Sequence, residues 1–202
     1  MKLFYPLLIA IAACTGAQAQ TQPAPTSHPK SQLEFGVGTS LNGTGDYACL
    51  KTHLGYNTLI NRHLSAGTRI AMISGTKVKY FGPDASVPVS YHAVNLENEV
   101  YFAPFGNDGR VVVALGGGAF VGYGQQYNFE YAQYARNANN QMEFTYKPKQ
   151  TNGLQVGYIA SLNTDFWLDA RQNWQVGFKL AIQNDNRATV LPGGQLKVSH
   201  RL

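Results

Sequence analysis

The sequence is short of charge, of cysteine and of long apolar runs. Charged residues make up 13% of its 202 residues, well below the level of about 25% that is usual in soluble domains. The 16 Lys and Arg are scattered, so the basic stripe typical of a nucleic-acid-binding surface is missing and no nucleic-acid partner is expected. No stretch approaches the ~18 consecutive apolar residues of a transmembrane helix.

Cysteine is too rare for a disulfide framework or a cysteine-based metal site. Cys14 lies in an N-terminal segment that we expect to be removed, which leaves Cys49 without a partner. The glycine run 116–118 lacks the Lys-Ser/Thr pair of a phosphate-binding loop, so no cofactor is expected. The histidines are dispersed rather than set at metal-ligand spacing. Those considered as ligands are His53, His63, His92 and His200.

The first 19 residues have the pattern of a secretory signal peptide. Lys2 provides a positive start, an apolar segment covers 3–13, and Ala17-Gln18-Ala19 is a small-x-small cleavage site. We therefore expect a signal peptide over 1–19 and a mature chain that begins at Gln20. The alternative is that Ile11-Ala12-Ala13-Cys14 acts as a lipobox and Cys14 becomes a lipid-anchored N-terminus.

The mature chain divides into a flexible leader over 20–31, rich in proline and small polar residues, and a barrel domain over 32–202. In the second part, apolar and polar residues alternate with the period of a β-strand. The alternating segments cover about 33–41, 50–60, 64–72, 94–102, 111–123, 154–168, 174–182 and 196–202. Several have the ~9–11 residues that a tilted strand needs to cross a bilayer.

The connections between these segments alternate in length. Short turns are expected at 61–63, 104–109 and 169–173, and long connections at about 42–48, 75–90, 124–150 and 183–195. Short turns on one side and long loops on the other are typical of outer-membrane barrels. The sequence therefore predicts an all-β fold, an eight-stranded antiparallel up-and-down transmembrane β-barrel.

With this signal peptide, strand number and loop asymmetry, residues 32–202 resemble the small outer-membrane β-barrel family, the OmpA-transmembrane-domain/OmpX-like porin family. The last segment, Val198 to Leu202, resembles its C-terminal closing strand, with Leu202 where members usually carry an aromatic residue. The resemblance implies a monomer in the cell outer membrane with membrane lipid as its partner. It implies no substrate and no site residues, since one fold can carry many unrelated functions.

Strand parity separates a charged interior from a lipid-facing exterior. We expect Arg69 to pair with Glu99 in the lumen, with Lys51 and Glu97 extending the pair into a network that closes the barrel. The full charged set is Glu34, Lys51, Arg69, Glu97, Glu99, Lys179, Lys197 and Arg201. The residues expected to face lipid are Leu54, Ile70, Val100, Val113, Val156 and Phe178.

Two patterns have a catalytic alternative. Glu97 and Glu99 share a strand face, as a general acid and base would, but we interpret them as lumen carboxylates balanced by Arg69 and Lys51. Ser90 and His92 also share a face, as a lipid-modifying deacylase would require. The chain has no longer signature of such an enzyme, and we expect no catalytic, cofactor-binding or metal-binding residues.

Aromatic residues gather at the two ends of the predicted strands, as in the girdles at both membrane interfaces. The turn-side group is Phe102, Phe105, Phe166, Trp167 and Trp174, and the loop-side group is Tyr80, Phe81, Tyr91, Tyr123 and Tyr127. The third long connection, Gly124–Gln150, keeps alternating around an Asn-rich turn, which predicts a Tyr-rich hairpin that reaches into the medium.

We therefore expect a structural or surface-interaction barrel with a plugged polar lumen, whose long loops meet a surface ligand or protein. The alternatives are a lipid-modifying outer-membrane enzyme and a soluble secreted calyx for a small apolar ligand. The charged set is too ionic to line an apolar calyx. The sequence does not specify the loop partner.

Overall fold

The computed structural model describes residues 31–43, 47–82, 84–136, 142–186 and 190–202. The predicted signal peptide, the lipobox alternative and nearly all of the leader lie outside these residues. Ser31, which we assigned to the leader, is the first residue of a strand.

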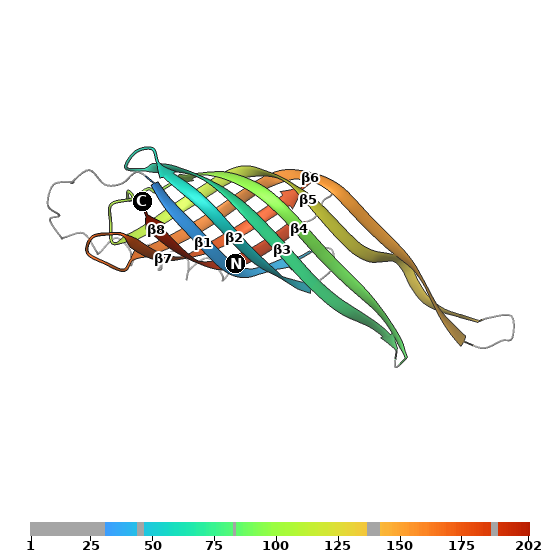
Figure 1. Ribbon diagram of the computed structural model, residues 1–202. Coiled ribbons are helices and arrows are strands. Elements are labelled where there is room, and N and C mark those ends of the chain that lie inside the picture. Colours follow the sequence, from blue (N-terminus) through green and yellow to red (C-terminus); the bar gives the residue numbers. More distant parts are fainter. Residues whose placement is uncertain (1–30, 44–46, 83, 137–141, 187–189) are drawn as a thin grey trace, which may run out of the picture.

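Eight strands form a closed antiparallel barrel in which each strand pairs with the next and β8 pairs with β1. This confirms the predicted fold class (Figure 1). Among the described residues, no helix has the length and apolarity to cross a membrane. The strands are β1 (Ser31–Asn42), β2 (Tyr47–Leu59), β3 (Leu64–Gly82), β4 (Ala85–Phe102), β5 (Val111–Arg136), β6 (Met142–Trp167), β7 (Trp174–Asp185) and β8 (Val190–Arg201).

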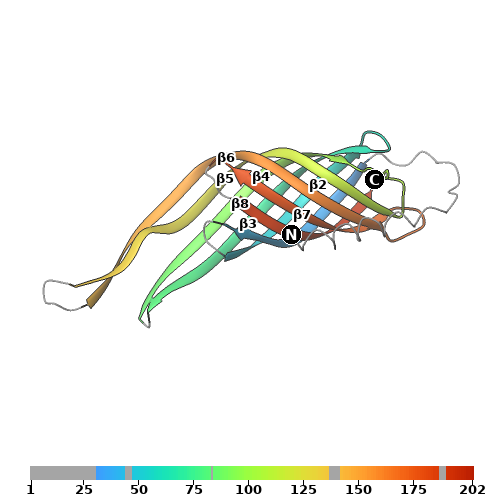
Figure 2. The ribbon, with the colours of Figure 1, turned by 180° about the vertical axis from the view of Figure 1, so that it is seen from behind.

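Two hairpins continue past the barrel at the end opposite the short turns, and β5–β6 reaches the farther of the two (Figures 1 and 2). The β3–β4 pairing runs to Gly82 and Ala85, and the β5–β6 pairing runs to Arg136 and Met142. Our assignments of 75–90 and 183–195 to long loops were therefore wrong, because β3 stays paired with β4 almost to the tip and β7 stays paired with β8 to Asn184 and Val190. The predicted hairpin within 124–150 is confirmed by its pairing.

Strand parity sorts the side chains as predicted. All six residues expected to face lipid point outward, and Leu54, for example, is 62% exposed. All eight charged residues assigned to the lumen are buried, at 8% exposure or less. The exterior is thus apolar and the interior polar.

Two residues assigned to the aromatic girdles point into the barrel instead. Trp167 is 5% exposed and Tyr91 is 3% exposed. Both occupy inward positions in the alternation of β6 and β4, because parity decides the direction of a side chain whatever its height on the strand. Girdle residues with outward parity on the ring itself, such as Phe102 and Trp174, are exposed. Tyr80 is also exposed, but it lies on the β3–β4 hairpin beyond the last residues that pair with β2, so its assignment to a girdle was wrong.

The glycine run 116–118 lies in the barrel wall within β5. A Cβ atom at Gly118 would overlap the backbone of Asn98 on β4, and one at Gly116 would overlap Ser161 and Tyr101. A Cβ at Gly117 would meet nothing. The two inward glycines therefore permit close approach in the wall, as the sequence suggested.

The β6–β7 turn is held by the Asp169 carboxylate. Its Oδ1 accepts hydrogen bonds from the backbone N–H groups of Asn173 at 2.8 Å and Trp174 at 2.9 Å. These bonds, that from Trp174 foremost, hold the pKa of Asp169 below its ordinary value.

Because this pKa is lower in the folded state, the carboxylate stabilises the fold above the pKa of the unfolded chain. That contribution is lost as the pH falls through the folded-state pKa. In an NMR titration in detergent micelles, the Asp169 side chain is expected to titrate at a lower pH than in the urea-unfolded chain. Equal midpoints would show that the two hydrogen bonds do not form in solution.

Candidate functional site

The most polar site of the protein is its own lumen. Among the described residues, four carboxylates form ion pairs with four cations there, and all eight groups are buried. The set therefore balances in charge, as a network removed from water requires. The carboxylates are Glu34, Glu97, Glu99 and Asp165, and the cations are Lys51, Arg69, Lys179 and Lys197.

Arg69 lies at the centre of the network. Its guanidinium is 2.8 Å from Glu99, 3.7 Å from Glu97 and 3.8 Å from Glu34. The predicted pair with Glu99 is confirmed, although the residue directly opposite Arg69 on β4 is Glu97. Within the part of the chain that the structure describes, neither Nη1 nor Nη2 has an aligned hydrogen bond, so these contacts are ion pairs rather than hydrogen bonds.

Glu99 has two further partners across the barrel. Lys179 Nζ on β7 donates to its Oε1 at 2.5 Å, and the Ser161 hydroxyl on β6 donates to its Oε2 at 2.6 Å. Lys51 pairs with Glu97 at 2.7 Å, as predicted. Both glutamates are therefore held by cations, which supports their assignment as lumen carboxylates rather than as a catalytic acid and base.

A second arm of the network runs through β8 and β1. Lys197 Nζ lies 3.1 Å from Glu34 and 3.0 Å from Asp165, and the His53 ring contacts Glu34 at 2.9 Å. Sequence reasoning missed Asp165 and the role of His53. Both share the inward parity of the charged set, and that was the signal available.

Buried apolar side chains pack together inside the barrel on the hairpin side of this network, and we refer to them as the apolar cluster. The buried cluster there consists of Tyr47, Cys49, Ile73, Val89, Tyr91, Ala93 and Leu191, with Phe129 packed against it. Cys49 is a free thiol. In the part of the chain that the structure describes, no group of three His, Cys, Asp or Glu is placed to hold a metal ion.

The exterior face of β4 carries the Ser–His arrangement that was considered for a deacylase. His92 Nδ1 does contact a serine hydroxyl at 3.0 Å, but the serine is Ser74 on β3, while Ser90 faces Thr76 and Tyr127. The strand register places His92 between Ser74 and Gln125, so neither neighbour supplies a carboxylate to orient the ring.

The two projecting hairpins are joined by an aromatic cluster. The Phe81 ring on β3 packs edge-on against Phe129 of β5 at 5.3 Å and lies 5.6 Å from Phe144 of β6. Tyr134 and Tyr146 flank Phe144. We refer to these five residues as the aromatic cluster.

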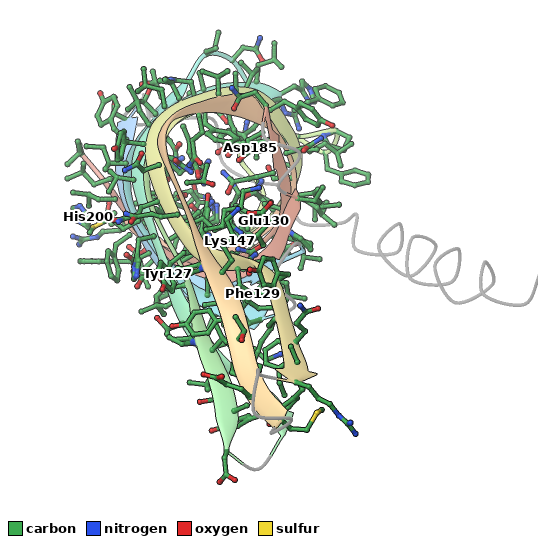
Figure 3. All side chains as sticks on the ribbon, turned by 90° about the vertical axis from the view of Figure 1, so that its right-hand side faces the viewer. Tyr127, Phe129, Glu130, Lys147, Asp185 and His200 are labelled. Atoms are coloured by element: carbon green, nitrogen blue, oxygen red, sulfur yellow. The ribbon has the colours of Figure 1, made fainter. Side chains whose placement is uncertain are left out.

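Charged and aromatic side chains mark the base of the longer hairpin. Glu130 lies in a register shift of β5, and its carboxylate pairs with Lys147 at 2.7 Å on the exposed surface. Figure 3 shows this pair and Phe129 on the β5–β6 hairpin, and His200 on the outside of the barrel.

Beyond the ring, each hairpin has backbone edges that pair with no other strand among the described residues. The β4–β5 pairing ends at Ser90 and Tyr127, and the β6–β7 pairing ends at Gly157. The edge of β6 carries Pro148 between two lysines, which discourages the addition of a strand. The edge of β5 over 128–136 has no proline and carries three aromatic residues.

No protein-family model and no curated protein matches the chain. Its structure is similar to that of Ail, the attachment invasion locus protein of Yersinia pestis, in complex with the heparin analogue sucrose octasulfate. The TM-score is 0.54 and the identity 11%, over 87% of this chain and 99% of Ail. It is also similar to Neisserial surface protein A (NspA), with a TM-score of 0.51 and 10% identity, over 85% of this chain and 96% of NspA.

Identities this low show a shared fold and nothing more. That fold, together with an apolar exterior and a charged interior, defines the architecture of the small eight-stranded outer-membrane β-barrels. The same polarity is the reverse of a calyx, which would bury apolar residues around a ligand, so the calyx alternative is not supported.

Proposed function

We propose that the chain is an outer-membrane β-barrel with a structural and surface-interaction role. The signal peptide over 1–19 exports it, the ring is embedded in lipid as a monomer, and the lumen is closed to ions. The hairpins β3–β4 and β5–β6 face the medium and form its binding surface. Glu97 and Glu99 are ion-paired with lumen cations, and His92 contacts Ser74 rather than Ser90. Both observations support a protein that is not an enzyme.

One observation carries this proposal: the β5–β6 hairpin continues well past the last residues that pair with β4 and β7. A barrel can be anchored in lipid without such an extension. The hairpin carries exposed aromatic side chains, among them Tyr131 at 45% and Tyr134 at 41% exposure, and aromatic residues dominate binding surfaces.

The partner that fits best is an extended peptide strand that adds to the free edge of β5. Main-chain hydrogen bonds would supply affinity and the neighbouring tyrosines would supply specificity. Charge does not favour a polyanion such as the sulfated sugar in the Ail structure. The segments 75–90 and 124–150 together hold five Lys or Arg and three Asp or Glu, a net charge of only +2.

A trimmed variant tests the surface role. Replacing residues 130–147 by a two-residue turn is expected to keep the barrel folded, because none of these residues pairs with β4 or β7 and Phe129, which packs against the apolar cluster, is retained. It should abolish retention of the protein on a bead-bound library of extended peptides. The double variant Tyr131→Ser/Tyr134→Ser should weaken retention while leaving the hairpin in place. Equal retention of trimmed and wild-type protein would contradict the proposal.

The closed lumen has its own test. Because the charge network links strands on opposite sides of the lumen and the apolar cluster packs on its hairpin side, the purified protein is expected to form no large, stable channels in planar lipid bilayers. Heat-dependent mobility on gels would confirm that the sample is folded. Large, stable wild-type channels would show that the network opens and would defeat this part of the proposal.

A further inference from the structure

The lumen is not filled evenly along its length. On the turn side of the charge network lies a cavity of about 60 Å³. It is lined by the ends of the strands that meet the short turns, including Tyr101 and Ala114, and Lys197 forms part of its wall. The hairpin side of the same network is packed with apolar side chains. On the turn side, a smaller buried apolar cluster that includes Tyr101, Val112 and Ala114 forms one part of the cavity wall.

Besides Asp165 Oδ1, which is ion-paired with Lys197, four polar atoms in the cavity wall have no hydrogen-bond partner among the described residues. They are Tyr101 Oη, Asn163 Oδ1, Trp167 Nε1 and Gln175 Oε1. Each residue is at least nine-tenths buried. A buried polar group without a partner is costly, so these atoms need a partner that enters the cavity.

The cavity is bounded by an ion pair at its inner end and by a stacked arginine at its outer end. The inner limit is the Lys197–Asp165 ion pair. At the outer limit, the Arg201 guanidinium lies 4.4 Å from the centroid of the Trp167 ring and donates to Gln172 Oε1 at 3.2 Å. Arg201 lies at a strand end and Gln172 lies in a turn, so these two side chains can move aside more easily than Lys197 and Asp165, which belong to an ion-pair network that joins several strands.

We propose that this cavity is a dead-end hydrated vestibule. It takes water and small polar molecules from the turn side as far as the Lys197–Asp165 pair and no farther. A water molecule needs about 10–15 Å³ and two to four polar partners, so the volume and the four unpartnered atoms suit a small water cluster. The vestibule goes beyond the proposed function, which concerns the hairpins and the closure of the lumen.

Two alanines allow a matched test by thiol labelling. Ala114 lines the vestibule and Ala93 lies in the apolar cluster, and each is 5% exposed. In the full chain with Cys14→Ser and Cys49→Ser, iodoacetamide is expected to alkylate Ala114→Cys faster than Ala93→Cys by about tenfold or more, because only the second needs local unfolding. A maleimide on a large polymer should label neither.

Val112→Cys and Val89→Cys form a second matched pair, since Val112 lines the vestibule and Val89 lies in the apolar cluster. They replace the alanine variants if one of those loses its heat-dependent gel mobility. Equal, slow labelling on both sides would overturn the vestibule and leave the closed lumen intact. Equal, fast labelling on both sides would show that small molecules pass the network, and would overturn both.

Discussion

Replacing Arg69 by methionine is expected to destabilise the folded barrel by about 3–5 kcal/mol, the usual cost of removing one partner of a buried ion pair. The substitution leaves Glu34, Glu97 and Glu99 with only the lysines to balance them, all removed from bulk water. Equilibrium unfolding in urea, followed by tryptophan fluorescence in lipid vesicles, measures the difference.

Arg62 provides the matched control. It also forms an ion pair, with Asp108 at 3.2 Å, but its side chain is 67% exposed. Arg62→Met should therefore cost at most about 1 kcal/mol, as exposed pairs do. Arg69→Met combined with Glu99→Gln should regain part of the loss, because three carboxylates then face three lysines. If Arg69→Met is as stable as Arg62→Met, the network does not hold the barrel together.

Phe178→Arg is expected to cost about 2–4 kcal/mol, since a cation near the middle of the lipid-facing band must leave water. Phe178 is the third of five outward positions that alternate along β7 from Trp174 to Ile182, and it is 43% exposed. The measurement is the same unfolding experiment, with the folded fraction read from heat-dependent gel mobility.

The same substitution at Phe105 is the control for this prediction. Phe105 is 60% exposed and lies in the turn between β4 and β5, beyond the strands. Phe105→Arg should leave stability nearly unchanged. If Phe178→Arg folds as well as Phe105→Arg, that part of the barrel is not surrounded by lipid.

Much of the fold followed from a single sequence property, the alternation of apolar and polar residues. It placed all eight charged residues inside, and the neighbouring strands β3 and β4 brought Arg69 to Glu99. It did not predict the contact of Lys179 with Glu99, because β4 and β7 are not neighbours and the pair meets across the lumen. Such contacts depend on the diameter and stagger of the ring, which no local pattern records.

Two errors show where the sequence signal ends. Trp167 and Tyr91 were assigned to the girdles from their height alone, although parity already placed them inside. The strands of 75–90 were taken for a loop because the alternation carries no mark where the bilayer stops. The alternation of apolar and polar residues therefore does not distinguish a loop that leaves the barrel from a hairpin whose strands continue beyond it.

The seam between β1 and β8 has a consequence for biogenesis. Gln32 pairs with Arg201, and the Leu202 N–H donates to the Ser31 carbonyl at 3.0 Å, so the seam joins residues separated by nearly the whole described chain. Contacts this distant in sequence are slow to form. Until β8 arrives, β1 and β7 are each left with an open edge that would pair with any available strand. The newly made polypeptide must therefore be kept apart from its neighbours until β8 can complete the circle.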